Sequence, residues 1–290
     1  MKKRICFIIN PISGISKKNN LPEIILSNLN LNKFDASFQF TEYKGHAIQI
    51  AIEAVKGKAD IICAVGGDGS VHEVAKGLIN SSCCLAIIPC GSGNGFARHL
   101  GLPLKIEKAI DRINNGKELI ADTGMLNVHH FINVCGFGFD AQIAHQFDKN
   151  PKRGFKTYAR LVLKEFKNFK AQTVIIKNGN EIIEKNIFLT SVANASQFGN
   201  GFKISPQSDI SDGKLELLLF RKTALRKMFM DLIKFFNGRI HQSKHSILIP
   251  FEEIELHLEN NIAHVDGEPL ILENNIAIIR VIPKSLKIIT

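Results

Sequence analysis

Two glycine-rich turns lie close together in the first half of the sequence, and each joins an apolar run to a helical pattern. The first is AVGGDGSVHEVAKGL at 64–78 and the second is IIPCGSGNGFARHLGLP at 87–103. Glycines let the backbone adopt positive φ and let a bulky anion approach the main chain, while the following helix directs unpaired N–H groups at that anion. The chain therefore repeats a strand–turn–helix unit, and each turn is a candidate phosphate site.

Alternating apolar runs and helical patterns occupy the chain up to about residue 124. Strands are predicted over 5–9, 38–40, 61–65 and 85–88, and helices over 22–30, 46–56, 71–79 and 106–114. This alternation is typical of a mostly parallel sheet, in which ligands bind at the carboxyl ends of the strands. The small-residue turn at 10–14 follows the first strand and is expected at that same edge.

Strand patterns dominate the rest of the chain. They cover 131–134, 173–177, 181–189, 214–220, 246–250, 254–258 and 276–283, with turn sequences between several of them. We therefore predict two domains. An α/β nucleotide-binding domain spans 1–124, and a β-rich antiparallel domain with inserted helices spans 125–290, with the last few residues able to return to the first domain.

Apolar runs in this 290-residue chain are far shorter than the roughly 20 residues that a membrane span needs. The apolar run at 5–9 is also too short for a signal peptide, so we expect a cytoplasmic protein. None of the six cysteines forms a CxxC pair, and we expect reduced, buried packing residues. We assign no metal to the ten scattered histidines.

A net charge of +10 calls for an anionic partner such as nucleic acid, an anionic membrane or a phosphorylated ligand. Much of the excess lies at 149–170, where eight basic residues accompany a single glutamate. Five of them recur at helical steps: Arg153, Lys156, Arg160, Lys164 and Lys167. An apolar stripe two residues later lies on the opposite helix face. This face is either the solvated side of an ordinary amphipathic helix or a surface for anionic headgroups, worth about 1 kcal/mol per basic residue.

Asp68 lies in the middle of the first glycine turn. An ionised carboxylate beside phosphates requires a cation, and Mg²⁺ commonly bridges carboxylates and phosphate oxygens. The alternative is a helix N-cap or an acid of the turn itself. Neither glycine turn fits the P-loop pattern or the dinucleotide fingerprint, so a different nucleotide geometry is expected.

Together, NPxSG at 10–14, GGDGS at 66–70, PCGSGN at 89–94 and DGE at 266–268 resemble the catalytic domain of the diacylglycerol kinase and sphingosine kinase superfamily. The chain looks most similar to the soluble bacterial lipid kinases of that group. The resemblance implies an N-terminal α/β domain of the NAD kinase/phosphofructokinase kind, a β-rich C-terminal domain, and ATP bound in the cleft between them.

The resemblance also implies roles for individual residues. Glu268 would be the general base of phosphoryl transfer, and Asp68 would act with the Mg²⁺ of the nucleotide. A structural Mg²⁺ would bind the Asp212 carboxylate, with backbone carbonyls from Asp209 and Lys214. The nucleotide would contact Asn10, Pro11, Ile12, Ser13, Gly14, Thr41, Gly66, Gly67, Asp68, Gly69, Ser70, Val71, His72 and Ser92.

Three positions depart from the family pattern. Gly95 replaces an aspartate that is usual in the bacterial enzymes, His72 replaces a more frequent asparagine, and Ser70 replaces threonine while keeping the hydroxyl. The acceptor is therefore open: a diacylglycerol-like lipid is favoured, with a sphingoid base, ceramide or phosphatidylglycerol as alternatives. Without the resemblance, Glu268 would be interpreted as a turn acid, because VDGEP is a good turn sequence.

We therefore predict an ATP-dependent lipid kinase that binds the membrane surface peripherally through its basic helix. An NAD kinase-like enzyme is one alternative, although the GSGNGFAR loop and the basic helix count against it. A catalytically silent nucleotide or lipid sensor is another, although the presence of Asp68 and Glu268 favours chemistry. A nucleic-acid binder lacks any recognition motif. A homodimer is left open.

Overall fold

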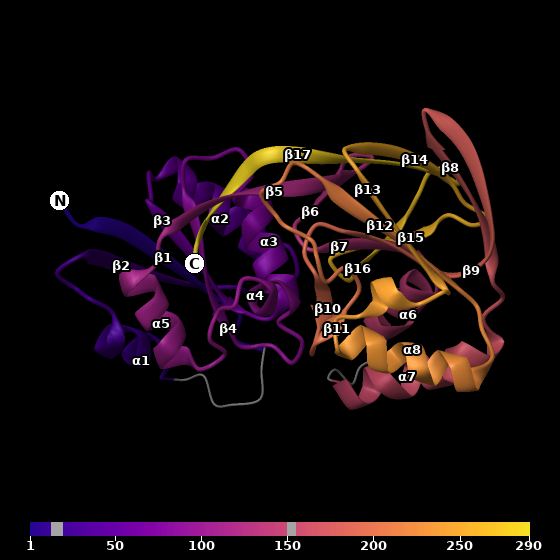
Figure 1. Ribbon diagram of the computed structural model, residues 1–290. Helices are drawn as coiled ribbons and strands as arrows, with labels where there is room; N and C mark the ends of the chain where they lie inside the picture. Colours follow the sequence, from indigo (N-terminus) through magenta and orange to yellow (C-terminus); the bar gives the residue numbers. More distant parts are fainter. Residues whose placement is uncertain (13–19, 150–154) are drawn as a thin grey trace. The chain divides into compact units, whose positions relative to one another are not determined.

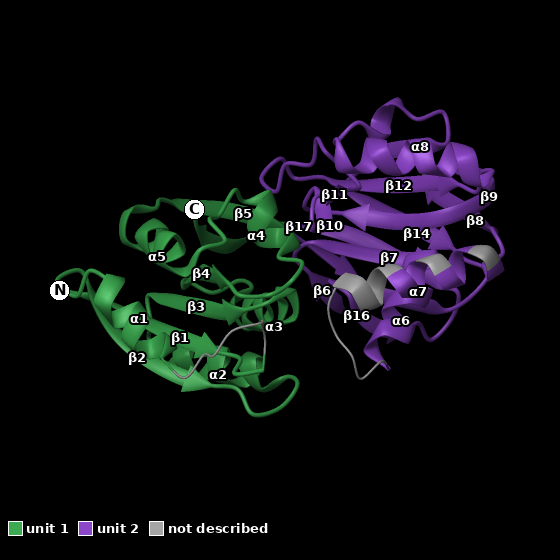
Figure 2. Ribbon diagram, turned by 90° about the horizontal axis from the view of Figure 1, so that it is seen from below, with its two compact units in different colours: residues 1–122, 283–290 green, residues 123–282 purple. Residues whose placement is uncertain are grey.

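The structure, a computed structural model, describes residues 1–12, 20–149 and 155–290. These residues form two compact units, shown in Figure 2. Unit 1 contains Met1–Asp122 and Pro283–Thr290, and unit 2 contains Thr123–Ile282. Each unit has its own hydrophobic core.

The sheet of unit 1 is parallel. Its strands follow the order β2-β1-β3-β4, with the end of β17 beside β4. Their bounds are β1 (Lys3–Ile9), β2 (Phe34–Phe40), β3 (Ile61–Gly66), β4 (Cys84–Pro89) and β17 (Ile276–Ile289). Every residue of β3 and β4 is buried, as expected for strands whose two faces are both covered by helices.

Helices cover both faces of this sheet (Figure 1). Those of unit 1 are α1 (Leu21–Asn28), α2 (His46–Lys56), α3 (Asp68–Leu78), α4 (Gly95–His99) and α5 (Ile106–Asn115). The α1 and α5 helices pack against the strand side chains that include Phe7 and Cys63, while α2 and α3 pack against each other and the opposite face. This alternation of helix and parallel strand confirms the α/β architecture predicted from the sequence pattern.

Two long strands pass between the units. The strand β5 (Glu118–Leu126) leaves unit 1, and β17 returns to it. Within unit 1, Lys117 and Thr290 exchange two backbone hydrogen bonds of 2.9 Å, so the end of the chain is held beside the start of β5.

Unit 2 is built on antiparallel strands paired in the order β16-β15-β7-β9-β8-β14-β17, with β12 joining β9 to β13. Their bounds are β6 (His129–Phe131), β7 (Val134–Gly138), β8 (Gln172–Asn178), β9 (Asn180–Ala193), β12 (Leu215–Arg221), β13 (Ser246–Phe251), β14 (Glu253–His257), β15 (Ile262–Val265) and β16 (Glu268–Ile271). A separate ribbon pairs β10 (Gln197–Gly199) with β11 (Phe202–Lys203). The predicted β-rich antiparallel second half is confirmed.

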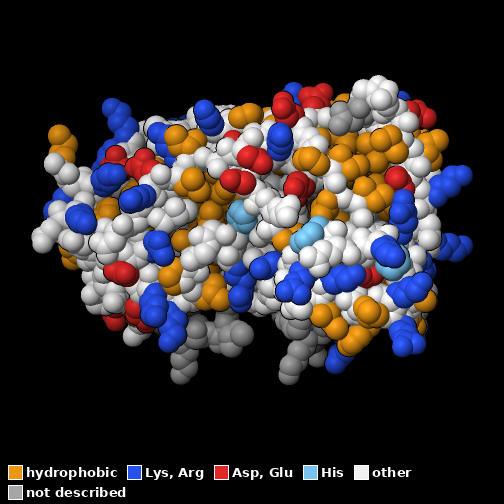
Figure 3. Space-filling model, in the orientation of Figure 1, with side chains coloured by type: hydrophobic (Ala, Val, Ile, Leu, Met, Phe, Trp, Pro, Cys, Tyr) orange, Lys and Arg blue, Asp and Glu red, His pale blue; other side chains and the backbone are white. Residues whose placement is uncertain are grey.

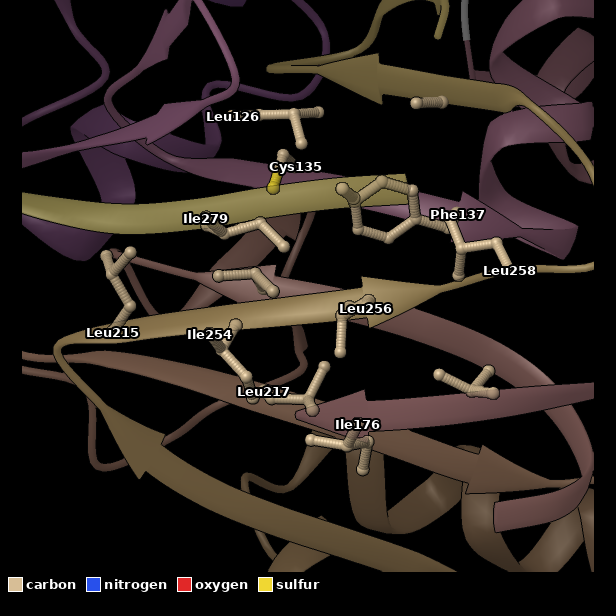
Figure 4. Close-up of a cluster of buried hydrophobic side chains, with 14 of the residues drawn as sticks. Leu126, Cys135, Phe137, Ile176, Leu215, Leu217, Ile254, Leu256, Leu258 and Ile279 are labelled. Carbon is tan, nitrogen blue, oxygen red and sulfur yellow. The ribbon is translucent and has the colours of Figure 1, made fainter. Parts of the chain in front are cut away.

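Two apolar cores stabilise unit 2. In the first, side chains from β7, β8, β12, β14 and β17 meet between the strands, as Figure 4 shows for Phe137, Leu217 and Leu256. The second lies between the sheet and three helices, α6 (Phe139–Asp148), α7 (Phe155–Asn168) and α8 (Leu225–Phe236). Phe139 of α6 stacks on Phe188 of β9, with ring centroids 4.3 Å apart. A short 3₁₀ helix, η1 (Ile240–Gln242), follows α8.

The strand predicted over 131–134 is interrupted. Residues 129–131 belong to β6 and residues 134–138 to β7, because the backbone N–H groups of Ile132, Asn133 and Val134 all donate to the Asp266 carboxylate. Strands β5, β15 and β16 and helix α6 were not anticipated. For β15 and β16, four residues each are too few for their alternation to stand out from the surrounding sequence.

All six cysteines lie in the described part of the chain, and none forms a disulfide. Burial raises the pKa of the Cys63 and Cys135 thiols well above the usual range, so these thiols are protonated packing groups. Every helix in the described ranges is too short or too polar to span a bilayer.

Candidate functional site

The carboxyl edge of the unit 1 sheet brings together most of the residues predicted to bind a nucleotide. Asn10 directly follows β1, and its N–H donates to the Val65 carbonyl at 3.2 Å. Thr41 directly follows β2, and its N–H donates to the Ile9 carbonyl at 2.9 Å. The segment Gly66–His72 ends β3 and begins α3. Because these strands run parallel, their carboxyl ends necessarily meet at one edge.

The turn after β1 is tied to the first helical turn of α3. Asn10 Nδ2 donates to Ser70 Oγ at 3.1 Å, and Asn10 Oδ1 accepts the Ile12 N–H at 3.1 Å. Pro11 and Ile12 are exposed beyond this anchor, while Ser13 and Gly14 lie outside the described residues. The hydroxyl that Ser70 shares with threonine therefore has a structural partner in the first turn.

The two glycine-rich loops contact each other through their backbones. A Cβ atom added to Gly91 would lie 2.6 Å from Cα of Gly67, and one added to Gly67 would lie 3.2 Å from Cα of Gly91. No side chain fits at Gly91 without displacing main chain. The strands β3 and β4 are parallel neighbours. The two turns that follow them therefore lie side by side at the same edge of the sheet.

Asp68 is held by the second loop. Its Oδ1 accepts a 2.6 Å hydrogen bond from the N–H of Gly95, the first residue of α4, and a Cβ atom on Gly93 would lie 2.7 Å from its Oδ2. Gly67, not Asp68, is the N-cap residue of α3, so the N-cap interpretation of Asp68 is wrong. The carboxylate is instead fixed across the two loops, at the start of a helix, where the backbone N–H groups favour negative charge.

Asn94 and Arg98 shape the second loop, and sequence analysis assigns neither of them a role. Asn94 adopts a left-handed conformation with φ +51°, and its side-chain amide bonds both the N–H and the carbonyl of Gly91 at 3.0 and 2.8 Å. Arg98 Nε donates to the Gly93 carbonyl at 3.0 Å. Ser92 is exposed at the tip of the loop. Asn94 is the N-cap residue of α4. The sequence signal for it is an asparagine between two glycines, since asparagine tolerates positive φ.

Val71 and His72 are buried, and the Val71 N–H donates to the Gly67 carbonyl at 3.0 Å. The neighbouring Glu73 holds the start of α2 in place. Its two carboxylate oxygens accept the N–H groups of Gly45 and Ala47, at 2.9 and 3.2 Å, at the start of α2.

Glu268 begins β16 directly after a tight turn. The turn is built from Asp266 at φ +49° and Gly267 at φ +86°, and Val265 pairs with Glu268 across it. The Asp266 carboxylate accepts three backbone N–H groups from residues 132–134, each at 2.9 Å. The Glu268 backbone is therefore anchored to β7 through its neighbours in the motif.

A buried polar cluster lies behind this turn, and sequence analysis missed it. Asp140 Oδ2 accepts from Ser191 Oγ at 2.7 Å and lies 3.2 Å from His264 Nε2. The Gly267 N–H approaches His264 Nδ1 at 3.3 Å, which favours the tautomer with its proton on Nε2, toward Asp140. A Cβ atom on Gly136 would overlap the Asp140 carboxylate, so this glycine leaves room for the cluster. Since Asp140 and His264 are 124 residues apart, no local pattern indicates the pair.

The loop before β12 carries the predicted structural metal residues. Asp209 Oδ1 accepts from the N–H and the hydroxyl of Ser211, and Asp212 Oδ1 accepts the Lys214 N–H at 2.9 Å. Burial raises the pKa of the Glu216 carboxyl, and the negative charge of Asp212 raises it further. Across the described ranges no three acidic, histidine or cysteine side chains converge as metal ligands, so a cation here would depend on backbone carbonyls.

Helix α7 carries the part of the basic stripe from Lys156 to Lys167. Arg160 and Lys164 are exposed, while Val162 and Phe166 pack into the second core of unit 2. Glu165 is buried and accepts a 2.7 Å hydrogen bond from Gln142 of α6. Arg153 lies outside the described residues, and the side chains of Lys156 and Lys167 are likewise not described.

The chain is a parallel α/β unit with paired glycine loops, followed by an antiparallel β unit, which is the architecture of the diacylglycerol kinase and NAD kinase folds. The sequence profile of the diacylglycerol kinase catalytic domain matches residues 4–126, and that of the YegS C-terminal NAD kinase β-sandwich-like domain matches residues 133–290. The chain belongs to the diacylglycerol kinase and YegS superfamily of lipid kinases.

Known relatives agree with both matches. A diacylglycerol kinase of Bacillus subtilis is 28% identical over 274 residues, covering 92% of this chain and 90% of the relative. The crystal structure of a diacylglycerol kinase from Bacillus anthracis superposes with a TM-score of 0.73 at 21% identity, covering 99% and 96% of the two chains. An NAD kinase from Archaeoglobus fulgidus in complex with ATP shares the fold at a TM-score of 0.51 and 13% identity, covering 99% and 93%.

Proposed function

We propose that this lipid kinase transfers the γ-phosphate of ATP to the hydroxyl of a diacylglycerol-like lipid. The observation that carries the proposal is the carboxylate of Asp68, fixed at 2.6 Å by the Gly95 N–H where two glycine loops meet. Glycine loops at helix N-termini bind phosphates, and a carboxylate among them calls for a divalent cation. The fold shared with an ATP-bound NAD kinase supports ATP as the donor.

In this proposal the nucleotide binds through the carboxyl edge of unit 1. The backbone N–H groups of Gly67–Ser70, which precede the first N–H bonded within α3, and the tip of the second loop at Ser92 would bind the phosphates, while Asn10 and Thr41 border the site. Asp68 is the residue that would hold Mg²⁺ with the nucleotide, and that ion would supply positive charge against the developing charge of the phosphates.

Glu268 is proposed as the acceptor of the hydroxyl proton. As the lipid oxygen forms its bond to the γ-phosphorus, the bond from that phosphorus to the bridging oxygen breaks and ADP leaves. The hydroxyl proton passes to the Glu268 carboxylate, and the anchored turn at Asp266 limits the movement of that carboxylate. Kinase activity that survives in Glu268→Gln would exclude this role.

The acceptor follows from the family, with one departure. The bacterial relatives commonly carry an aspartate at the position of Gly95, so this chain has one acid fewer there. The backbone N–H of Gly95 donates to the Asp68 carboxylate. The test is transfer of labelled γ-phosphate from Mg·ATP to lipids in mixed micelles, comparing the natural chain with Asp68→Ala. The panel contains diacylglycerol, phosphatidylglycerol, sphingosine and ceramide, with NAD as a soluble alternative. Label on diacylglycerol that the variant abolishes is expected, and label on NAD alone would overturn the proposal.

A structural Mg²⁺ is proposed at the loop before β12. Asp212 would supply its carboxylate, and the backbone carbonyls of Asp209 and Lys214 would complete an all-oxygen set suited to Mg²⁺. Added Mg²⁺ is expected to raise the melting temperature of the natural chain and not that of Asp212→Asn.

Peripheral membrane binding through α7 is proposed as well. Arg160 and Lys164 project from the exposed side of a helix whose other side is packed in the core, so the helix is held by the protein. An enzyme whose acceptor lies in a bilayer must reach that surface, and exposed cations attract anionic headgroups reversibly.

A further inference from the structure

Helix α8 presents an unpartnered apolar face. Met228, Asp231 and Phe235 point into unit 2 and are buried, which leaves the opposite side of the helix outward. That side carries five large apolar side chains with much of their surface exposed: Leu225 (61%), Phe229 (66%), Met230 (60%), Ile233 (48%) and Phe236 (48%). Four of them recur at steps of four, four and three residues, so they form one continuous stripe, hereafter the α8 stripe.

The charges around the α8 stripe are positive. Arg226 and Lys227 are exposed on the first turn, and Arg239 is exposed just beyond the last. The one acid of the helix, Asp231, faces inward and is bound by Ser243 Oγ, His245 Nδ1 and Lys234 Nζ, at 2.7, 2.7 and 3.1 Å. Figure 3 shows Lys and Arg side chains bordering hydrophobic ones over the position of α8.

A shallow depression of about 290 Å³ adjoins the α8 stripe. Met230, Ile233, Lys234 and Arg239 are among the residues that line it. Apolar and cationic side chains around one depression match the acyl and phosphate ends of an anionic phospholipid.

We propose that α8 is a membrane-insertion helix, whose apolar stripe enters the acyl region of an anionic bilayer while its flanking cations contact lipid phosphates. Amphipathic helices with aromatic and aliphatic residues on one face and basic residues beside it lie in the membrane interface in this way. Lysine and arginine can bury their aliphatic stems while keeping the charge at the headgroups. A second copy of the chain fits less well, because a symmetric contact through this face would bring the cations beside both stripes, Arg226, Lys227 and Arg239, into one interface.

The position of α8 supports the same partner. Side chains of α6, α7 and α8 all pack into the second core of unit 2, so the three helices cover one face of its sheet, and Figure 1 shows α7 and α8 on the same side of the strands of that unit. A bilayer bound by the α8 stripe would therefore lie on the side of the unit that also carries Arg160 and Lys164.

Membrane insertion by α8 is separate from phosphoryl transfer, so it can be tested without ATP and without a lipid to phosphorylate. The full chain is sedimented with vesicles of equal parts phosphatidylglycerol and phosphatidylcholine. The double variant Phe229→Gln/Ile233→Gln is expected to bind at least about tenfold more weakly, with an unchanged melting temperature, because both side chains are exposed. The matched control is Ile182→Gln/Ile183→Gln, which removes two exposed apolar side chains from β9 and is expected to bind as the natural chain does.

A fluorescent probe gives an independent readout. The natural chain has no tryptophan, so Phe229→Trp introduces a single reporter on the stripe. Its emission is expected to shift to the blue with vesicles and to be quenched by brominated lipid, whereas Ile183→Trp on β9 is expected to do neither.

Several outcomes would overturn the inference: vesicle binding that is absent or unchanged by the double variant, an equal loss in the β9 control, or loss of self-association without loss of vesicle binding. A chain that binds vesicles through α8 but phosphorylates no lipid would leave the inference standing and overturn the proposed function. A chain that phosphorylates micellar lipid without binding vesicles would do the reverse.

Discussion

The backbone N–H of Gly95 donates a 2.6 Å hydrogen bond to Oδ1 of Asp68, and this bond joins the two glycine loops of unit 1. The carboxylate therefore has two separable properties. It accepts a hydrogen bond that fixes the second loop, and it carries a negative charge at the edge where phosphates are proposed to bind.

Asp68→Asn is expected to separate these properties. The asparagine oxygen can still accept the Gly95 N–H, so the melting temperature should remain close to that of the natural chain. Loss of the charge should lower kcat by roughly a hundredfold or more, the scale seen when one electrostatic contact to a transition state is removed. Asp68→Ala should lose both activity and about 1 kcal/mol of stability. Steady-state kinetics and thermal unfolding measure the two effects, and full activity in Asp68→Asn would contradict the role of the charge.

Gly91→Ala is expected to disrupt the loop contact. Its Cβ atom would lie 2.6 Å from Cα of Gly67 and 2.9 Å from Oδ1 of Asn94, so the backbone must move. We expect a cost of about 1–3 kcal/mol and weaker nucleotide binding, measured by denaturation and by ATP titration. The control is Gly57→Ala, whose nearest neighbour would be 3.3 Å away. Equal effects of the two substitutions would show that the contact does not restrict Gly91.

Asp266→Ala is expected to destabilise unit 2 by about 3 kcal/mol, because three backbone N–H groups of residues 132–134 would lose a charged acceptor. Asp266→Asn should cost less. Its amide oxygen can still accept from Asn133 and Val134, which share Oδ1, while the amide nitrogen would face the Ile132 N–H. Hydrogen exchange at residues 132–134 reports the change directly, and unchanged protection in Asp266→Ala would refute the anchoring role.

The stability of unit 2 should depend on pH through Asp231. This buried carboxylate pays a desolvation cost that would raise its pKa, but hydrogen bonds from Ser243, His245 and Lys234 outweigh it, and the pKa lies below the ordinary 3.8. Because the pKa of Asp231 is lower in the folded than in the unfolded chain, its ionisation stabilises the folded state at pH above 3.8. This stabilisation is lost as the pH falls from 3.8 through the pKa of the folded state.

Asp231→Asn should therefore be less stable than the natural chain at neutral pH, by about 2 kcal/mol, with the difference shrinking in acid. Melting temperatures measured from neutral pH to below 3.8 test this directly. Asp35→Asn, which changes an exposed carboxyl on β2, is the matched control. A difference that persists undiminished at the lowest pH would contradict the linkage.

Charge reversal on α7 tests its proposed contact with anionic lipid. Arg160→Glu/Lys164→Glu should weaken binding to anionic vesicles by about tenfold or more, and added salt should narrow the difference, because each exposed cation near such a surface contributes about 1 kcal/mol. Lys105→Glu/Lys108→Glu makes the same change at exposed positions of unit 1 and should have little effect. Equal losses in both pairs would indicate a response to net charge alone.

Local sequence patterns were sufficient for the fold class and the family. The buried runs in β1, β3 and β4 and the amphipathic helices between them carry their periodicity within a few residues, and glycine limits the turns they can form. The superfamily could be identified because each of its motifs is a short run of consecutive residues. Local patterns failed where strands are short, as at β15 and β16, and where a distant side chain intervenes, as when Asp266 interrupts the strand predicted at 131–134.

The sequence by itself determined which segments become strands, helices and glycine turns, because those choices depend on neighbouring residues. Only the tertiary structure decided that Gly67 meets Gly91, that Asp68 bonds Gly95 and caps no helix of its own, and that Asp140 pairs with His264. It also decided which face of α8 points outward, since a helical pattern does not state which apolar residues find a core. These outcomes depend on contacts between residues far apart in the chain, which form only when the sheets bring them together.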